Sequence, residues 1–81
     1  MKLRHAFNLA KTIEITWYPQ RYNSSQMKIS KVSAKKNIKP MYDDYLGIDG
    51  DDHGGDLLWY DDGGTIIASY YLNTETLVLG V

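Results

Sequence analysis

A tight-turn motif in the second half of the chain constrains its fold more than any other local feature. The residues Asp61-Asp62-Gly63-Gly64 separate two segments rich in apolar and aromatic residues, 57–60 and 65–72. An aspartate-glycine pair supplies the positive φ angles that a tight β-hairpin needs. The sequence therefore predicts an antiparallel hairpin. The length of the turn sets the expected pairs: Tyr60 with Thr65, Trp59 with Ile66, Leu58 with Ile67 and Leu57 with Ala68.

This register assigns one face of the hairpin to the core, because alternate residues of a strand share a face. The residues expected on that face are Leu57, Trp59, Ile66, Ala68, Tyr70 and Leu72. After a turn at 73–76, the segment Leu77 to Val81 is expected to form a final strand.

The first third of the chain shows a second strand pattern. Thr12 to Tyr18 alternates apolar and polar residues before Pro19 removes a backbone donor, and Met27 to Ser33 is expected to return as its antiparallel partner after a turn at 20–26. Before it, apolar residues at spacings of three and four between Leu3 and Ala10 predict a short helix.

The two remaining segments are expected to connect these elements. Residues 34–40 form a lysine-rich connector, and residues 41–56 form a glycine- and aspartate-rich loop that has room for a helical turn at 41–46. The expected fold class is α+β, mainly β: a single domain over residues 1–81 with one small antiparallel sheet of about five strands and one or two short helical segments.

Charge is divided sharply along the chain. The first forty residues hold all nine lysines and arginines and one acid, a net charge of +8, whereas the residues from Met41 onward hold nine acids and no base, a net charge of −9. The total of −1 therefore hides two opposite fields, which favours binding to charged partners. The chain has no cysteine, no apolar run long enough for a membrane span and no leader pattern, so we expect a soluble protein of the cytoplasm.

The loop at 49–56 is the richest in metal-ligand residue types. Its start resembles an EF-hand calcium loop, but the position of the bidentate glutamate is occupied by Tyr60. His53 with Asp51 and Asp56 gives an alternative nitrogen and oxygen site, so zinc or calcium are the candidate ions. The competing interpretation is a solvated acidic turn, because glycine and aspartate first of all favour turns.

Catalysis is not expected. Adjacent carboxylates on an extended chain point in opposite directions, so the Asp43-Asp44, Asp51-Asp52 and Asp61-Asp62 pairs do not converge, and no glycine pair is followed by the lysine of a phosphate loop. The lysines between Lys28 and Lys39 suggest either a nucleic-acid contact or a solvated strand edge. We do not expect direct nucleic-acid binding, because the acidic half repels phosphate.

The first third also carries a family resemblance. Ala6-Phe7-Asn8-Leu9-Ala10, followed by Ile13-Glu14-Ile15-Thr16-Trp17-Tyr18-Pro19, resembles the start of a group of short uncharacterised proteins encoded by phages and prophages of Gram-positive bacteria. In size and in its lack of a catalytic motif, the chain is also similar to anti-CRISPR proteins as a class. The resemblance implies action in the host cytoplasm and assigns no active residue.

These observations predict a phage-encoded inhibitor that binds a host protein, such as a CRISPR effector nuclease or another nucleic-acid-binding protein, through an acidic face that competes with DNA. Trp59 and three tyrosines are expected to anchor the contact, since aromatic residues dominate binding hot spots. The alternatives are a nucleic-acid-binding or regulatory protein that uses the lysine-rich half, and a structural or immunity-type module. The expected contact residues are Asp43, Asp44, Asp49, Asp51, Asp52, Asp56, Asp61, Asp62, Tyr42, Tyr45 and Tyr60.

Overall fold

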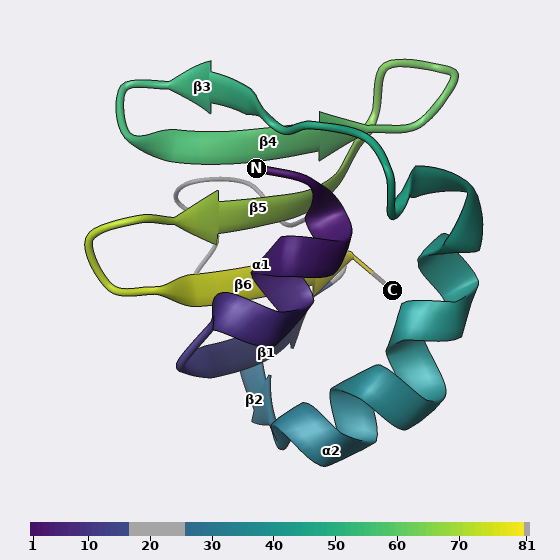
Figure 1. Ribbon diagram of the computed structural model, residues 1–81, viewed down its shortest axis with the longest axis vertical. Helices are drawn as coiled ribbons and strands as arrows, with labels where there is room; N and C mark the ends of the chain where they lie inside the picture. The colour runs from purple at the N-terminus through teal and green to yellow at the C-terminus, as the bar shows by residue number, and fades with distance from the viewer. Residues whose placement is uncertain (17–25, 81) are drawn as a thin grey trace.

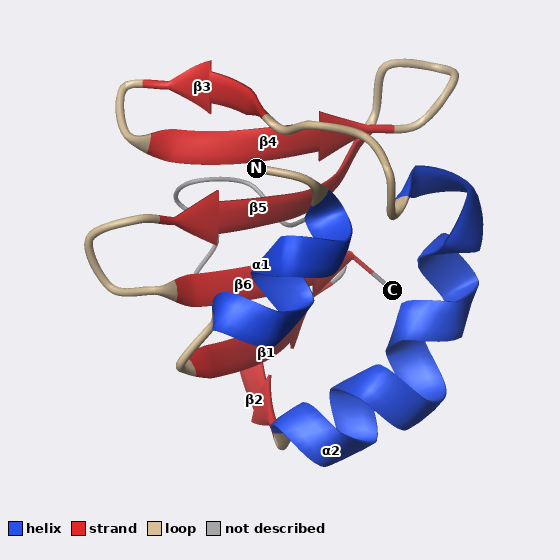
Figure 2. Ribbon diagram, viewed as in Figure 1, coloured by secondary structure: helices blue, strands red, loops and turns tan. Residues whose placement is uncertain are grey.

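A six-stranded mixed sheet with helices on one face forms the protein (Figures 1 and 2). The computed structural model describes residues 1–16 and 26–80. The strand order is β2-β1-β6-β5-β4-β3, and every neighbouring pair is antiparallel except β1 with β6. The predicted α+β class is confirmed. The sheet has one more strand than expected and one parallel pair, which no local pattern indicated.

The N-terminal elements match their prediction. Helix α1 (Leu3–Leu9) buries Leu3, Ala6 and Phe7 against the sheet, and strand β1 (Thr12–Thr16) follows directly. The rest of the expected strand and most of the turn at 20–26 lie outside the described residues. Strand β2 (Met27–Ile29) pairs antiparallel with β1, as expected.

The segment after β2 is helical over residues 31–45. The helical turn expected at 41–46 is present, whereas the expected strand end at 31–33 and connector at 34–40 are helical too, which differs from the prediction. Ser30 caps this segment, since its Oγ accepts a 3.1 Å hydrogen bond from the amide of Ser33. Pro40 has no amide hydrogen to donate, so the regular helical hydrogen-bond ladder is interrupted within the segment. The helical turns are α2 (Lys31–Ser33), the π-helical η1 (Ala34–Ile38) and the 3₁₀-helical η2 (Lys39–Tyr45).

The predicted hairpin exists, but its register is different. Strand β4 (Asp56–Tyr60) pairs with β5 (Ile66–Tyr71), and Trp59 faces Ala68 instead of Ile66 because the register shifts between Trp59 and Tyr60. From Leu57 to Trp59 the slip is two residues, which keeps these side chains on their faces, whereas Tyr60 pairs with Ile66, a slip of one. Leu57, Trp59, Ala68 and Tyr70 are therefore buried as predicted, whereas Ile66 is half-buried and Leu72 is exposed.

Strands β3 and β6 complete the sheet. Strand β3 (Asp51–His53), in a segment expected to be a loop, pairs with β4 and forms one edge of the sheet. Strand β6 (Thr76–Gly80) was expected and lies between β5 and β1, so the last described strand of the chain pairs with the first.

The core lies between the sheet and the helices. Its buried side chains come from α1, the helical segment and the inner strands, and the largest of them is Trp59, which is 2% exposed. The buried cluster consists of Leu3, Ala6, Phe7, Ala10, Ile13, Ala34, Tyr42, Leu57, Trp59, Ala68, Tyr70, Leu77 and Leu79.

Candidate protein-binding surface

Four aspartates from two distant segments lie at one end of the molecule and form what we call the acidic tip: Asp43 and Asp44 from η2, and Asp61 and Asp62 from the turn between β4 and β5. Tyr45 is the last residue of η2. Burial raises the pKa of Tyr45, and the charges of Asp62, Asp61 and Asp44 raise it further, which places these three carboxylates near the phenol. Figure 1 shows the end of η2 on the same side of the sheet as the β4–β5 turn.

Asp61 also holds the turn that carries it. Its Oδ1 accepts hydrogen bonds of 2.9 Å from the amides of Gly63 and Thr65, and its amide donates to the carbonyl oxygen of Thr65 at 2.9 Å. Gly64 follows with a φ of +81°, the conformation that the glycine-rich turn was expected to supply. The side chain that presents charge at the tip is therefore also the side chain that fixes the tip.

A second acidic feature is the outer strand of the sheet. Asp51 and Asp52 on β3 are both exposed, and we call this pair the acidic edge. Asp52 Oδ1 accepts a 3.1 Å hydrogen bond from the amide of Gly55, which fixes the β3–β4 turn. Gly54 and Gly55 have φ angles of +66° and +101°, so this turn depends on two residues without Cβ atoms.

Asp49 has a different role. Its carboxylate lies 3.5 Å from the N-terminal amine of Met1, and its backbone forms an isolated bridge with Lys2. The amide of Gly50 donates to the carbonyl oxygen of Met1 at 2.9 Å. Asp49 therefore belongs to a contact that attaches the N-terminus to the segment before β3, and its charge is already compensated.

Two of the expected aromatic anchors are part of the core. Tyr42 is 4% exposed, and its hydroxyl lies within hydrogen-bonding distance of the carbonyl oxygens of Ile67 and Gly80. Burial raises the pKa of Tyr42 to about 12. Trp59 is also buried, so the expectation that these two side chains contact a partner is wrong.

Tyr45 and Tyr60 remain as half-buried aromatic side chains. The hydroxyl of Tyr60 lies 3.2 Å from Nε2 of His53, and the two rings meet edge to face with centroids 6.5 Å apart. His53 is therefore engaged with a tyrosine across the β3–β4 hairpin.

The expected metal site finds no support in the geometry. Asp51, His53 and Asp56 all belong to the β3–β4 hairpin, where His53 faces Asp56 and Asp51 faces Leu58. Within residues 1–16 and 26–80, no three histidine, aspartate or glutamate side chains lie close enough together to hold a metal ion. Neither the zinc nor the calcium arrangement is formed, because the hairpin spreads these residues along two strands instead of wrapping them around a point.

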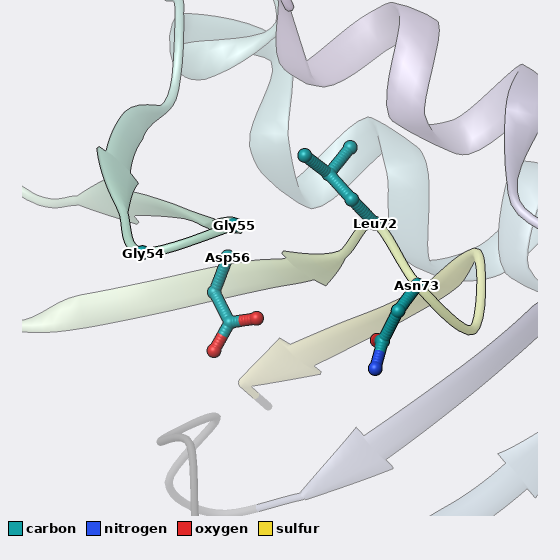
Figure 3. A pocket seen from close by; sticks show the side chains of 5 residues that line it. All are labelled: Gly54, Gly55, Asp56, Leu72 and Asn73. Carbon is teal, nitrogen blue, oxygen red and sulfur yellow. The ribbon is translucent and has the colours of Figure 1, made fainter.

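Two hollows open at the end of the sheet opposite the acidic tip. The larger, about 400 Å³, is lined by Gly54, Gly55, Asp56, Leu72 and Asn73, and Figure 3 shows the side chains of Asp56 and Asn73 extending to one side and Leu72 to the other. The smaller, about 270 Å³, is lined by Met1, Leu9, Tyr70, Leu72 and Glu75. Among the described residues, Asp56 is the only titratable side chain that lines the larger hollow.

Three lysines of the first half of the chain are exposed on β2 and η1. Lys28 on β2 and the pair Lys35 and Lys36 on η1 are exposed. Two other lysines have structural contacts: Lys31 donates to the carbonyl oxygen of Asn8 at 2.9 Å, and Lys39 lies 6.0 Å from the ring centroid of Phe7.

The sequence predicts the aspartates of the acidic tip as contact residues, but it does not predict that they come together. Asp44 and Asp61 are far apart in sequence, and the helical segment that brings them together follows from the Ser30 cap, which was not recognised. The spacing of Ser30 and Ser33 is the local signal from which the cap could be predicted.

No family model, curated protein or solved structure matches this chain. No helix within the described residues has both the length and the apolar character needed to cross a membrane.

Proposed function

We propose that this chain is a phage-encoded inhibitor that binds a host nucleic-acid-processing protein, with a CRISPR effector nuclease as the foremost candidate, and that its acidic tip occupies a basic surface that otherwise receives DNA. The observation that carries the proposal is the convergence of Asp44, Asp61 and Asp62 around Tyr45. A fixed group of carboxylates presents negative charge at a protruding end of the molecule, as a nucleic-acid backbone does with its phosphates.

The charges at the tip are available to a partner. Within the described residues, ion pairs join Asp49 to the N-terminus and Lys11 to Glu75. The four aspartates of the acidic tip form no ion pair with a lysine, arginine or histidine of these residues. Electrostatic complementarity of this kind raises the association rate more than it slows dissociation.

The tip also has an apolar component. Tyr45 is half-buried near the carboxylates of Asp44, Asp61 and Asp62, and an aromatic side chain in such a position gives a contact area at small entropic cost. Asp61 anchors the turn through two backbone amides, so the arrangement exists before binding. Preorganisation of this kind lowers the cost of association.

The experiment uses three baits in parallel. The first is the wild-type chain; the second carries Asp43→Asn, Asp44→Asn, Asp61→Asn and Asp62→Asn; the third, a matched control, carries Lys35→Gln and Lys36→Gln. Asparagine at position 61 keeps the acceptor oxygen that holds the turn, so the fold is expected to survive. All three are exposed to a lysate of a Gram-positive bacterium that contains a CRISPR effector.

The expected result is capture of a nucleic-acid-binding protein by the wild-type and lysine-neutralised baits and its loss from the aspartate-neutralised bait. A second arm measures binding of each purified chain to labelled DNA without any partner. Equal capture by all three baits would contradict the role of the acidic tip. Direct DNA binding that disappears in the lysine-neutralised chain would favour the alternative in which the basic half contacts nucleic acid.

A further inference from the structure

The two edges of the sheet carry opposite charge. At one edge, β2 presents the exposed Lys28, whose cross-strand partner on β1 is Glu14, and the exposed Lys35 and Lys36 follow on η1. At the other edge, β3 presents the acidic edge, Asp51 and Asp52. The strand order places these edges at opposite ends of a six-stranded sheet (Figure 1), so Lys28 and the acidic edge lie on opposite borders of the sheet.

The two edge strands also run in the same direction. Passing from β2 to β3 crosses four antiparallel pairs and one parallel pair, and an even number of reversals restores the original direction. A second copy placed beside the first in the same orientation would therefore align its β2 in parallel with β3 of the first. Within the described residues, β2 and β3 each pair with one neighbouring strand, so each has an outer side.

The charges discriminate between the ways in which two copies can meet. Two-fold pairing of β3 with β3 is antiparallel and places Asp52 opposite Asp52, and two-fold pairing of β2 with β2 places Lys28 opposite Lys28, so both symmetric arrangements are repelled. Only the contact of β2 with β3 brings opposite charges together. The net charge of −1 adds little overall repulsion between copies.

We propose that this chain associates head to tail with copies of itself through β2 of one copy and β3 of the next. A contact of this type repeats unless its rotation closes a ring, so the assemblies have no fixed size. Each edge strand is three residues long, which makes the contact small and reversible. This inference does not depend on the proposed inhibitor function. Its consequence is that self-association covers Asp51 and Asp52, so a partner that uses the acidic edge must compete with it.

Two charge-reversed variants test the contact. Asp51→Lys with Asp52→Lys gives a chain with two basic edges, and Lys28→Glu gives a chain with two acidic edges. All three positions are exposed, and circular dichroism verifies that each variant is folded. Arg4→Glu is the control, because it reverses an exposed charge on α1 that lies on no edge strand and outside the acidic tip. Sedimentation velocity is measured for each chain over a range of concentrations at about 0.01 M and about 1 M salt, where charges act over about 30 Å and about 3 Å.

The wild-type and control chains are expected to sediment faster as concentration rises at low salt, and to remain monomeric at high salt. Each edge variant alone is expected to associate at least about tenfold more weakly, and an equimolar mixture of the two is expected to regain association, because the edges of one variant then complement those of the other.

Three results would overturn the proposal: a wild-type chain that stays monomeric at low salt and high concentration, an edge variant that associates as strongly as the wild type, or a mixture that remains monomeric. Should a reversed chain fail to fold, Asp51→Asn with Asp52→Asn tests the same contact, and undiminished association of that variant would exclude it.

Discussion

The indole Nε1 of Trp59 donates a 2.7 Å hydrogen bond to the carbonyl oxygen of Ile48. The same carbonyl accepts a 3.1 Å hydrogen bond from the amide of Leu3, so one oxygen joins β4, the segment before β3 and the start of α1. Trp59 therefore does more than fill the core. It holds in place the segment that connects the acidic tip to the acidic edge.

Trp59→Ala is expected to lower the free energy of unfolding by about 3 to 5 kcal/mol, because it leaves a large cavity and removes one of the two hydrogen bonds to the carbonyl oxygen of Ile48. That loss is most of the stability expected for a domain of this size. Urea unfolding followed by circular dichroism measures it, and a loss below about 1 kcal/mol would be inconsistent with the buried position of the indole.

Gly50 is packed against the same indole. A Cβ atom at this position would lie 2.9 Å from Cζ2 of Trp59 and 3.0 Å from Cβ of Leu57. Gly50→Ala is therefore expected to destabilise the protein by about 1 to 3 kcal/mol through overpacking. Gly63→Ala is the matched control, because its Cβ would meet only Asp61 Oδ1 at 3.5 Å, and a change within about 0.5 kcal/mol is expected. Equal effects of the two substitutions in urea unfolding would argue against close packing at Gly50.

Two substitutions of Asp61 distinguish the role of its charge from the role of its hydrogen bonds in the turn. Asp61→Asn removes the charge and keeps the acceptor oxygen, whereas Asp61→Ala also removes the hydrogen bonds to Gly63 and Thr65. We expect the asparagine variant to be as stable as the wild type and the alanine variant to lose about 1 to 2 kcal/mol. Asp62→Ala, at a neighbouring exposed position, is the control. Thermal unfolding of the three variants checks this, and equal stability of the alanine and asparagine variants would show that the side chain does not fix the turn.

Tyr42 makes the free energy of unfolding depend on pH in the alkaline range. Its pKa is raised from 10.0 to about 12 in the folded chain, so the unfolded chain loses the phenolic proton first as pH rises. The stabilisation is complete below pH 10 and is lost progressively up to pH of about 12. Tyr42→Phe is expected to cost about 1 kcal/mol at neutral pH, since the hydroxyl no longer bonds Ile67 or Gly80, and to show a shallower decline of stability above pH 10. Identical slopes for wild type and variant would contradict burial of this phenol.

The sequence contains enough local information for α1, β1, β2, β6 and the β4–β5 hairpin, because turn chemistry and alternation specify them. It does not contain a local signal for the parallel pairing of β1 with β6, which joins the two ends of the chain. The predicted hairpin register assumes a regular turn and is wrong. Asp61 Oδ1 instead accepts hydrogen bonds from the amides of Gly63 and Thr65, and the strand register shifts between Trp59 and Tyr60.

The candidate site shows the same limit. The sequence shows the aspartates as charges and favours a helical turn at 41–46, where Tyr42 lies, but it does not suggest the helical turns of the lysine-rich segment before it. Likewise, β3 lies in a polar segment that has no local strand pattern, and it forms a strand by pairing with β4. The opposite charges of the two sheet edges follow from strand order, which is a property of the whole chain.

The most direct measurement of the central claim is the displacement of fluorescently labelled DNA from a purified, guide-loaded CRISPR effector nuclease, followed by anisotropy. The wild-type chain is predicted to release the DNA and to saturate at about one chain per effector. The variant with Asn at positions 43, 44, 61 and 62 is predicted to need at least about tenfold more protein, mainly because it associates more slowly. Equal displacement by both chains, or an effector that holds DNA and the wild-type chain at the same time, would contradict the account.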